Sequence, residues 1–149
     1  MKRFSFSLQS VQDQRQIRRE AAEREFAAAV AELAAAAALV DKTIRERNAA
    51  IEGYTALLES GDVDPEEVIL RANHIALLTQ RERERRARLE LFERAKEAKR
   101  QALVATSRDE KAINNLRERH RARHDLGVAR IEQTALDEMA TISYVRRCE

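Results

Sequence analysis

One short segment near the middle of the chain interrupts a sequence that otherwise suits uninterrupted helix. Residues 59–67 read Glu-Ser-Gly-Asp-Val-Asp-Pro-Glu-Glu and hold the only proline of the chain and one of its three glycines. Gly61 can adopt the left-handed conformation that often follows the end of a helix. Asp64 can cap a new helix, Pro65 suits its first position, and Glu67 completes a capping box. The segment therefore predicts that one helix ends here and a second one begins.

Apolar residues on both sides of this segment recur at alternating steps of three and four, the spacing of a coiled-coil seam. We predict an all-α fold, a long antiparallel two-helix coiled-coil hairpin with a C-terminal helical overhang. It forms a single hairpin over residues 1–149, with helix one over about residues 6–60, the turn at 61–64 and helix two over about residues 65–145. The first stripe contains Leu8, Val11, Ala22, Phe26, Ala29, Leu33, Ala36, Val40, Ile44, Ile51, Tyr54 and Leu58.

The composition favours a thin seam between helices over a thick globular core. Aromatic residues make up only 4% of the chain and charged residues 36%, and much of the apolar content is alanine. The alanine-rich stretch at residues 27–38 allows two interpretations. It either lets the partner helix approach unusually closely, or it reflects only the high helix propensity of alanine.

The position of the turn predicts which residues face each other. A hairpin that folds about residues 62–63 places residue i beside a residue near about 125 minus i. Phe4 and Phe6 are then expected near Arg119 and Arg121, and residues beyond about 122 have no partner within the chain. The overhang nevertheless carries an apolar stripe, which contains Val128, Ile131, Ala135, Met139, Ile142 and Val145. An apolar stripe on an isolated helix indicates docking into another protein, or ordering only on assembly.

A charged run, Arg81–Arg86, leaves the apolar stripe of helix two nearly empty. We favour a solvated segment with internal ion pairs, and the alternative is a docking patch for an acidic partner. Over the whole chain, 28 basic residues nearly balance 26 acidic ones. This balance argues against a protein that binds nucleic acid through its net charge, and aromatic residues that could stack on bases are not interleaved with the arginines.

The sequence contains no pattern typical of an active site, and we expect neither an enzyme nor a cofactor. His120 and His124 have the spacing of two metal ligands on one helical face. Arginines flank both, and cationic neighbours oppose metal binding, so we expect no metal site. Cys148 is the only cysteine and suggests a reducing compartment. The chain start lacks the apolar run of a signal peptide, and the apolar stretch at residues 27–40 is too short to span a bilayer. We therefore expect a cytoplasmic protein.

Segments near the two ends of the chain resemble a known family. Phe4-Ser5-Phe6-Ser7-Leu8-Gln9-Ser10-Val11, followed by Arg15 and an alanine-rich acidic helix, resembles the opening of the flagellar export protein FliJ family. The segment Ile131-Glu132-Gln133-Thr134-Ala135-Leu136-Asp137-Glu138-Met139-Ala140 is similar to the C-terminal segment of that family. The resemblance implies a component of the type III export apparatus that acts as a central stalk in the hexameric export ATPase. Such a stalk promotes ring assembly, couples the ATPase to the export gate protein, and interacts with export chaperones.

The resemblance also implies site residues. The end that faces the ATPase ring would contain Phe4, Phe6, Leu8, Val11, Arg15, Val128, Ile131, Leu136 and Met139. A patch that binds the export gate would fall on His74, Ile75, Leu78 and Arg81, and Arg81 departs from the small apolar residue of the family pattern. Any association with the inner membrane would be peripheral and through partners, and the free protein is expected to be a monomer.

Two other functions are compatible with a two-helix hairpin. The first is a generic coiled-coil scaffold or adaptor, which would bind a helical partner through the overhang without any ATPase. The second is a rod that binds nucleic acid, for which the near-balanced charge gives little support.

Overall fold

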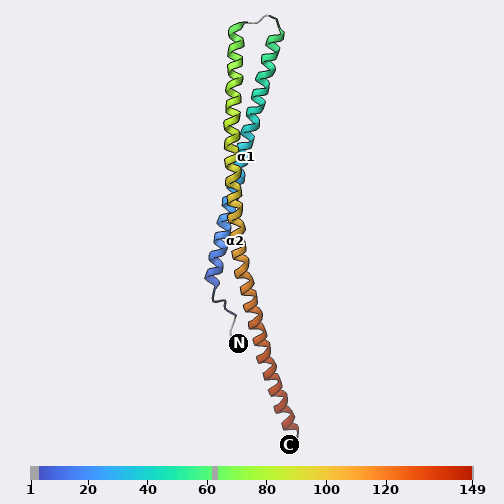
Figure 1. The fold of residues 1–149 in the computed structure, drawn as a ribbon. Coiled ribbons are helices and arrows are strands. Elements are labelled where there is room, and N and C mark those ends of the chain that lie inside the picture. Colours follow the sequence, from blue (N-terminus) through green and yellow to red (C-terminus); the bar gives the residue numbers. More distant parts are fainter. Residues whose placement is uncertain (1–3, 62–63, 149) are drawn as a thin grey trace. The chain divides into compact units, whose positions relative to one another are not determined.

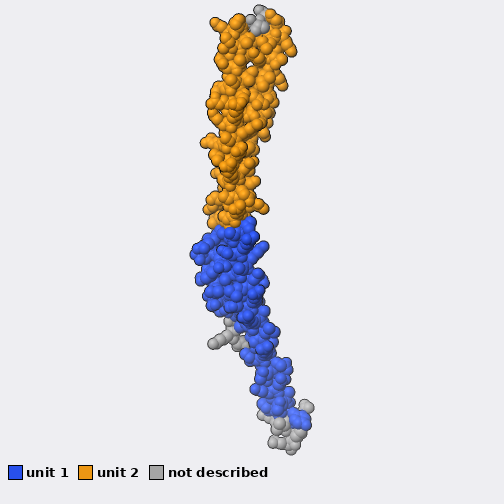
Figure 2. Space-filling model, viewed as in Figure 1, with its two compact units in different colours: residues 1–20, 104–149 blue, residues 21–103 orange. Residues whose placement is uncertain are grey.

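The computed structural model describes residues 4–61 and 64–148, and side chains as far as Tyr144. It contains two helices, α1 (Gln9–Glu59, 51 residues) and α2 (Pro65–Cys148, 84 residues) (Figure 1). The described residues form no strand. The prediction of an all-α helical hairpin is confirmed. The chain divides into two compact units, which are described separately below: residues 1–20 with 104–149, and residues 21–103 (Figure 2).

The turn between the helices uses the residues that the sequence indicated. Gly61 has a φ of 75°, in the left-handed region that favours glycine. Asp64 caps α2, since its Oδ1 accepts a hydrogen bond from the backbone N–H of Glu66 at 3.0 Å. The expected capping-box partner, Glu67, instead accepts a hydrogen bond from Arg71 Nε at 2.9 Å. Residues 62–63, about which the hairpin is predicted to reverse direction, lie outside the described residues.

The first helix begins three residues later than we expected from the sequence. The N–H of Gln9 bonds to the carbonyl of Phe6 at 3.1 Å, and the first helical bond runs from Gln12 N to the carbonyl of Leu8 at 3.0 Å. Residues 4–8 are consequently not helical. Phe4 and Phe6 therefore lie on a segment that can follow the surface of α2 instead of continuing the axis of α1.

Residues 21–103 contain an antiparallel pair of helical segments joined by the turn. Glu25 pairs with Lys99 at 2.8 Å, whereas Arg47, further along α1, pairs with Glu82, which comes earlier on α2. The buried apolar side chains of this unit are Ala29, Ala36, Val40 and Leu78. The seam is therefore thin and built mostly from small residues, as the composition indicated.

The other unit pairs the start of the chain with the second half of α2. Phe6 and Ile113 are its buried apolar residues, and Gln12 bonds to Asn114 across the pair at 2.8 Å. Every described side chain from Ala129 to Tyr144 is exposed. This part of α2 is the predicted helical overhang.

Candidate partner-binding surfaces

The chain start packs on α2 through two aromatic contacts with histidines. The ring of Phe6 lies 5.8 Å from that of His120, and the ring of Phe4 lies 5.5 Å from that of His124, both edge to face. Phe6 is only 6% exposed. His120 adjoins Arg119 and Arg121 along α2, so Phe6 lies in the region that the turn position predicted. Phe4 contacts a residue slightly further along α2.

Polar contacts continue the pairing along the start of α1. Gln12 donates to Asn114 Oδ1 at 2.8 Å and accepts from Arg117 at 3.1 Å. The guanidinium of Arg15 donates to the backbone carbonyl of Asp109 at 2.7 Å. Arg15 is thus occupied in holding α1 against α2. Of the apolar residues expected at this end, Leu8 is exposed and Val11 is half-buried.

The overhang presents an open apolar face on α2. Val128 is half-buried, whereas Ile131, Leu136 and Met139 are each exposed, with Ile131 at 70%. Leu126, Ile142 and Tyr144 are also exposed apolar side chains of this segment, and the side chain of Val145 lies outside the described residues. In this unit, the part of α2 at the two histidines is covered by the chain start. The apolar part that follows directly after it is uncovered.

The four residues expected in the patch early on α2 have different environments. His74 and Arg81 are exposed, Ile75 is half-buried, and Leu78 is only 3% exposed because it lies in the seam. A partner cannot reach Leu78 while the helices are paired.

Two exposed leucines, Leu70 and Leu77, complete the accessible face of this segment. They share it with His74 and Arg81, because residues spaced by four, three and four positions lie on one side of a helix. Reasoning from the sequence missed both leucines. The only signal for them was this second helical spacing, which runs beside that of the seam.

A match to one family model covers nearly the whole chain. The family model described as Flagellar FliJ protein matches residues 4–149. The chain belongs to this family. No curated protein and no solved structure matches the chain. FliJ proteins are non-catalytic components associated with flagellar type III protein export. The chain is therefore a flagellar export protein, and the resemblance noted at its two ends extends over nearly its whole length.

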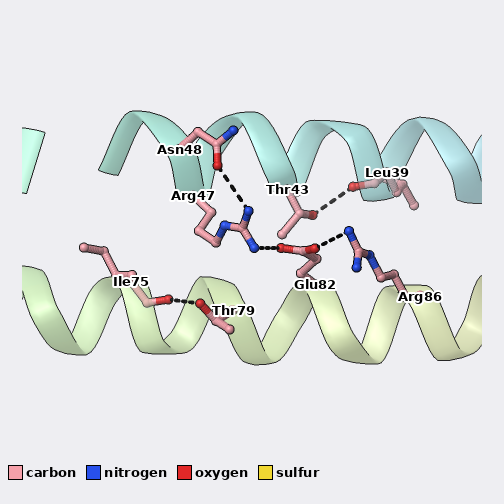
Figure 3. Close-up of polar contacts among 8 residues, drawn as sticks. All are labelled: Leu39, Thr43, Arg47, Asn48, Ile75, Thr79, Glu82 and Arg86. Carbon is pink, nitrogen blue, oxygen red and sulfur yellow. Dashed lines mark hydrogen bonds and ion pairs between the residues drawn. The ribbon is translucent and has the colours of Figure 1, made fainter. Parts of the chain in front are cut away.

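Within residues 21–103 of this FliJ protein, the two helices are held together by a buried polar cluster (Figure 3). Glu82 is 4% exposed, and its carboxylate accepts hydrogen bonds from Arg47 of α1 and, at 2.7 Å, from Arg86 one turn further along α2. Ion pairs within the charged run were expected, but the burial of Glu82 contradicts a fully solvated segment. Two arginines therefore compensate the one buried carboxylate, and the Arg47–Glu82 pair links the two helices.

One arginine of the same run crosses to α1. Arg85 donates to the backbone carbonyl of Leu39 at 3.0 Å and to the hydroxyl of Thr43. Thr43 is fully buried, and its hydroxyl donates in turn to the carbonyl of Leu39 at 2.8 Å. Glu82 and Arg85 therefore fill the gap that the apolar stripe leaves at this position.

The two histidines that have the spacing of metal ligands are both engaged by the chain start. His120 and His124 have their rings against Phe6 and Phe4, and no group of three or more potential metal ligands occurs among the described residues. Over its described residues, neither helix is long and apolar enough to cross a membrane. The exposed apolar side chains of this FliJ protein include those of the overhang and those on α2 near the turn.

Proposed function

We propose that the chain is a stalk of the flagellar export ATPase complex, which promotes assembly of the hexameric ATPase ring and couples it to the export gate. Membership of the FliJ family supports a place in the export apparatus. The observation that carries the stalk role is the open apolar face of the overhang, led by Ile131 and Met139. Burial of this face inside a ring would remove from water the apolar area that the chain itself leaves uncovered.

In this proposal, the paired chain start sets the depth to which the ring can enclose the overhang. Phe6 is held by His120 and Arg15 by the backbone of Asp109, so these residues act by positioning α2. Direct contacts with the ATPase fall to Leu8 and Val11 at the rim and to Val128, Ile131, Leu136 and Met139 on the overhang.

The test measures ATP hydrolysis and hexamer formation of the cognate export ATPase with and without the purified chain. The native chain is expected to increase both. Ile131→Asp and Met139→Asp should abolish the increase, because burial of an unpaired carboxylate opposes docking. Thr141→Asp is the matched control, since it places the same charge at an exposed position on the side of the helix opposite Met139. An ATPase that does not respond to the native chain, or that responds equally to all three variants, would contradict the stalk role.

We further propose that the outer face near the turn binds the export gate protein. The proposal rests on the exposed set of Leu70, His74, Leu77 and Arg81. Ile75 and Leu78 are left out because they lie on the side of α2 that faces the seam. Leu77→Asp should abolish capture of the cytosolic part of the gate protein, and Ala76→Asp, an exposed neighbour on another side of α2, should not. Retention of capture in Leu77→Asp would remove this assignment.

The remaining partners follow from the family and have no surface assigned to them. Export chaperones would be bound by the free chain, which we propose to be a cytoplasmic monomer. It would reach the inner membrane only through the gate and the ATPase.

A further inference from the structure

The alanine-rich part of α1 is far more apolar than a single seam requires. Between residues 27 and 40, Glu32 is the only charged residue, yet only Ala29, Ala36 and Val40 are buried. Leu39 is 50% exposed. A helix that is apolar around most of its circumference is normally covered on more than one side. This segment therefore has apolar surface left over after α2 has packed against it.

A groove lies along one side of this segment, between α1 and α2 within residues 21–103. It has a volume of about 470 Å³. Its lining residues are Glu32, Ala35, Ala36 and Leu39 from α1, and Arg85, Arg88 and Phe92 from α2. Alanines form its small-residue side, while Leu39 and Phe92 supply larger apolar walls. The groove lies between two antiparallel helices, where the ridge of a third helix can pack.

The α2 edge of the groove is positively charged. Arg85 is held by Leu39 and Thr43, whereas Arg88 makes no ion pair within the described residues. A neighbouring hollow of about 620 Å³ shares both arginines and is also lined by Arg81 and Glu84. Cations therefore outnumber carboxylates along this edge. The planar guanidinium of arginine matches a carboxylate with two parallel hydrogen bonds.

We propose that this groove binds an amphipathic α-helix of another protein, with small or aliphatic residues toward α1 and carboxylates toward Arg88. The occupant would make a local three-helix arrangement and cover the alanine face. The positive edge disfavours a second copy of this chain, which would bring the same arginines. The lining of the groove contains no residue of the overhang or of the Leu70–Arg81 face, so the proposal does not depend on the function proposed for either.

The test uses two synthetic helical peptides of about three heptads, which share alanine and leucine at the seam positions. One carries glutamate beside the seam and the other carries lysine. Binding to the full chain is measured by fluorescence anisotropy at physiological salt. The acidic peptide is expected to bind at least about tenfold more tightly than the basic one, since charged hydrogen bonds distinguish them.

Matched variants locate the binding site. Arg88→Glu should weaken binding of the acidic peptide at least about tenfold, and Arg83→Glu, an exposed arginine of the same helix outside the groove lining, should leave it unchanged. Ala35→Gln should block the groove, whereas Ala34→Gln, an exposed position on another side of α1 outside the groove lining, should not. Ala35 and Arg88 are exposed, so neither substitution is expected to disturb the fold. A circular dichroism spectrum that matches that of the native chain checks this for each variant.

Three results would overturn the proposal. The first is no binding of the acidic peptide up to millimolar concentration, or binding that Arg88→Glu and Ala35→Gln both leave intact. The second is a concentration-dependent dimer in sedimentation that Ala35→Gln abolishes, which would assign the groove to self-association. The third is binding of a short DNA duplex that competes with the peptide and is lost in Arg88→Glu, which would assign the arginine edge to a polyanion.

Discussion

Two regions of α2 invert the usual distribution of polar and apolar side chains. In the middle of the hairpin, Glu82 is 4% exposed, whereas Ile131 in the overhang is 70% exposed. The glutamate is buried because two arginines neutralise it, one of them on α1. The isoleucine is exposed because α1 does not extend beside it. The comparison shows that burial in a two-helix protein depends on what lies opposite a residue more than on its own hydrophobicity.

The largest expected effect comes from removing the buried carboxylate. Glu82→Ala should lower the free energy of unfolding by about 3 kcal/mol, because it leaves Arg47 without its partner in the seam. The free energy is measured by urea denaturation followed by circular dichroism. Ile131→Ala, which removes a larger apolar side chain from the overhang, should change the same quantity by less than about 0.5 kcal/mol.

A double variant separates the charge from the pairing. Arg47→Leu combined with Glu82→Leu removes both charges and should remain within about 1 kcal/mol of the native chain, since an apolar pair can replace a buried ion pair. If Glu82→Ala were as mild as Ile131→Ala, the carboxylate would contribute little to the seam and the contrast between the two regions would fail.

The second effect concerns the boundary between the covered and uncovered parts of α2. Phe6→Ala should destabilise the pairing of the chain start by about 2 kcal/mol, from the loss of a buried phenyl ring. The effect should be local and appear as amide hydrogen exchange about thirtyfold faster at the start of α1. Phe6→Leu should retain most of the protection. Equal acceleration throughout α1 would indicate that the chain start is not an independent cooperative segment.

The sequence predicted the features that depend on neighbouring residues along the chain. The turn chemistry of Gly61, Asp64 and Pro65 is local, and the helices follow from apolar spacing over many turns. The overhang was predicted because the turn position fixes how far α1 can reach, whatever the side chains are.

The features that the sequence did not reveal depend on the opposite helix. Leu77 and Leu78 are the same residue type, but their side chains point about 100° apart around the helix. Only Leu78 packs against α1. The burial of Glu82 required knowing that Arg47 lies across from it. The ring contacts of Phe4 and Phe6 with histidines depend on the true start of α1, which lies three residues later than expected.

A third prediction concerns the helix at the base of the overhang. Gly127 lies inside α2, and a Cβ added there would meet no other atom within 4 Å. Gly127→Ala should therefore stabilise this part of α2 by about 1 kcal/mol through helix propensity alone. The gain is measured as slower amide exchange on both sides of residue 127. Gly61→Ala is the opposite case, since a φ of 75° strains any residue with a side chain. An unchanged exchange rate in Gly127→Ala would show that α2 gains nothing there from helix propensity.

The smallest effect contrasts an exposed carboxylate with the buried one. Lys99 lowers the pKa of Glu25 below its ordinary value of 4.5, first through a hydrogen bond at 2.8 Å and then through its charge. Because the folded-state pKa is lowered, the pair contributes stability above pH 4.5 and loses it as the pH falls through the lowered pKa. Lys99→Met should return the pKa of Glu25 toward 4.5 in an NMR titration. Glu25 is fully exposed, so the change in unfolding free energy should be near the limit of detection at moderate salt. A pKa of Glu25 that does not move in Lys99→Met would mean that this contact is not maintained in solution, and that only buried ion pairs such as that of Glu82 hold the two helices in register.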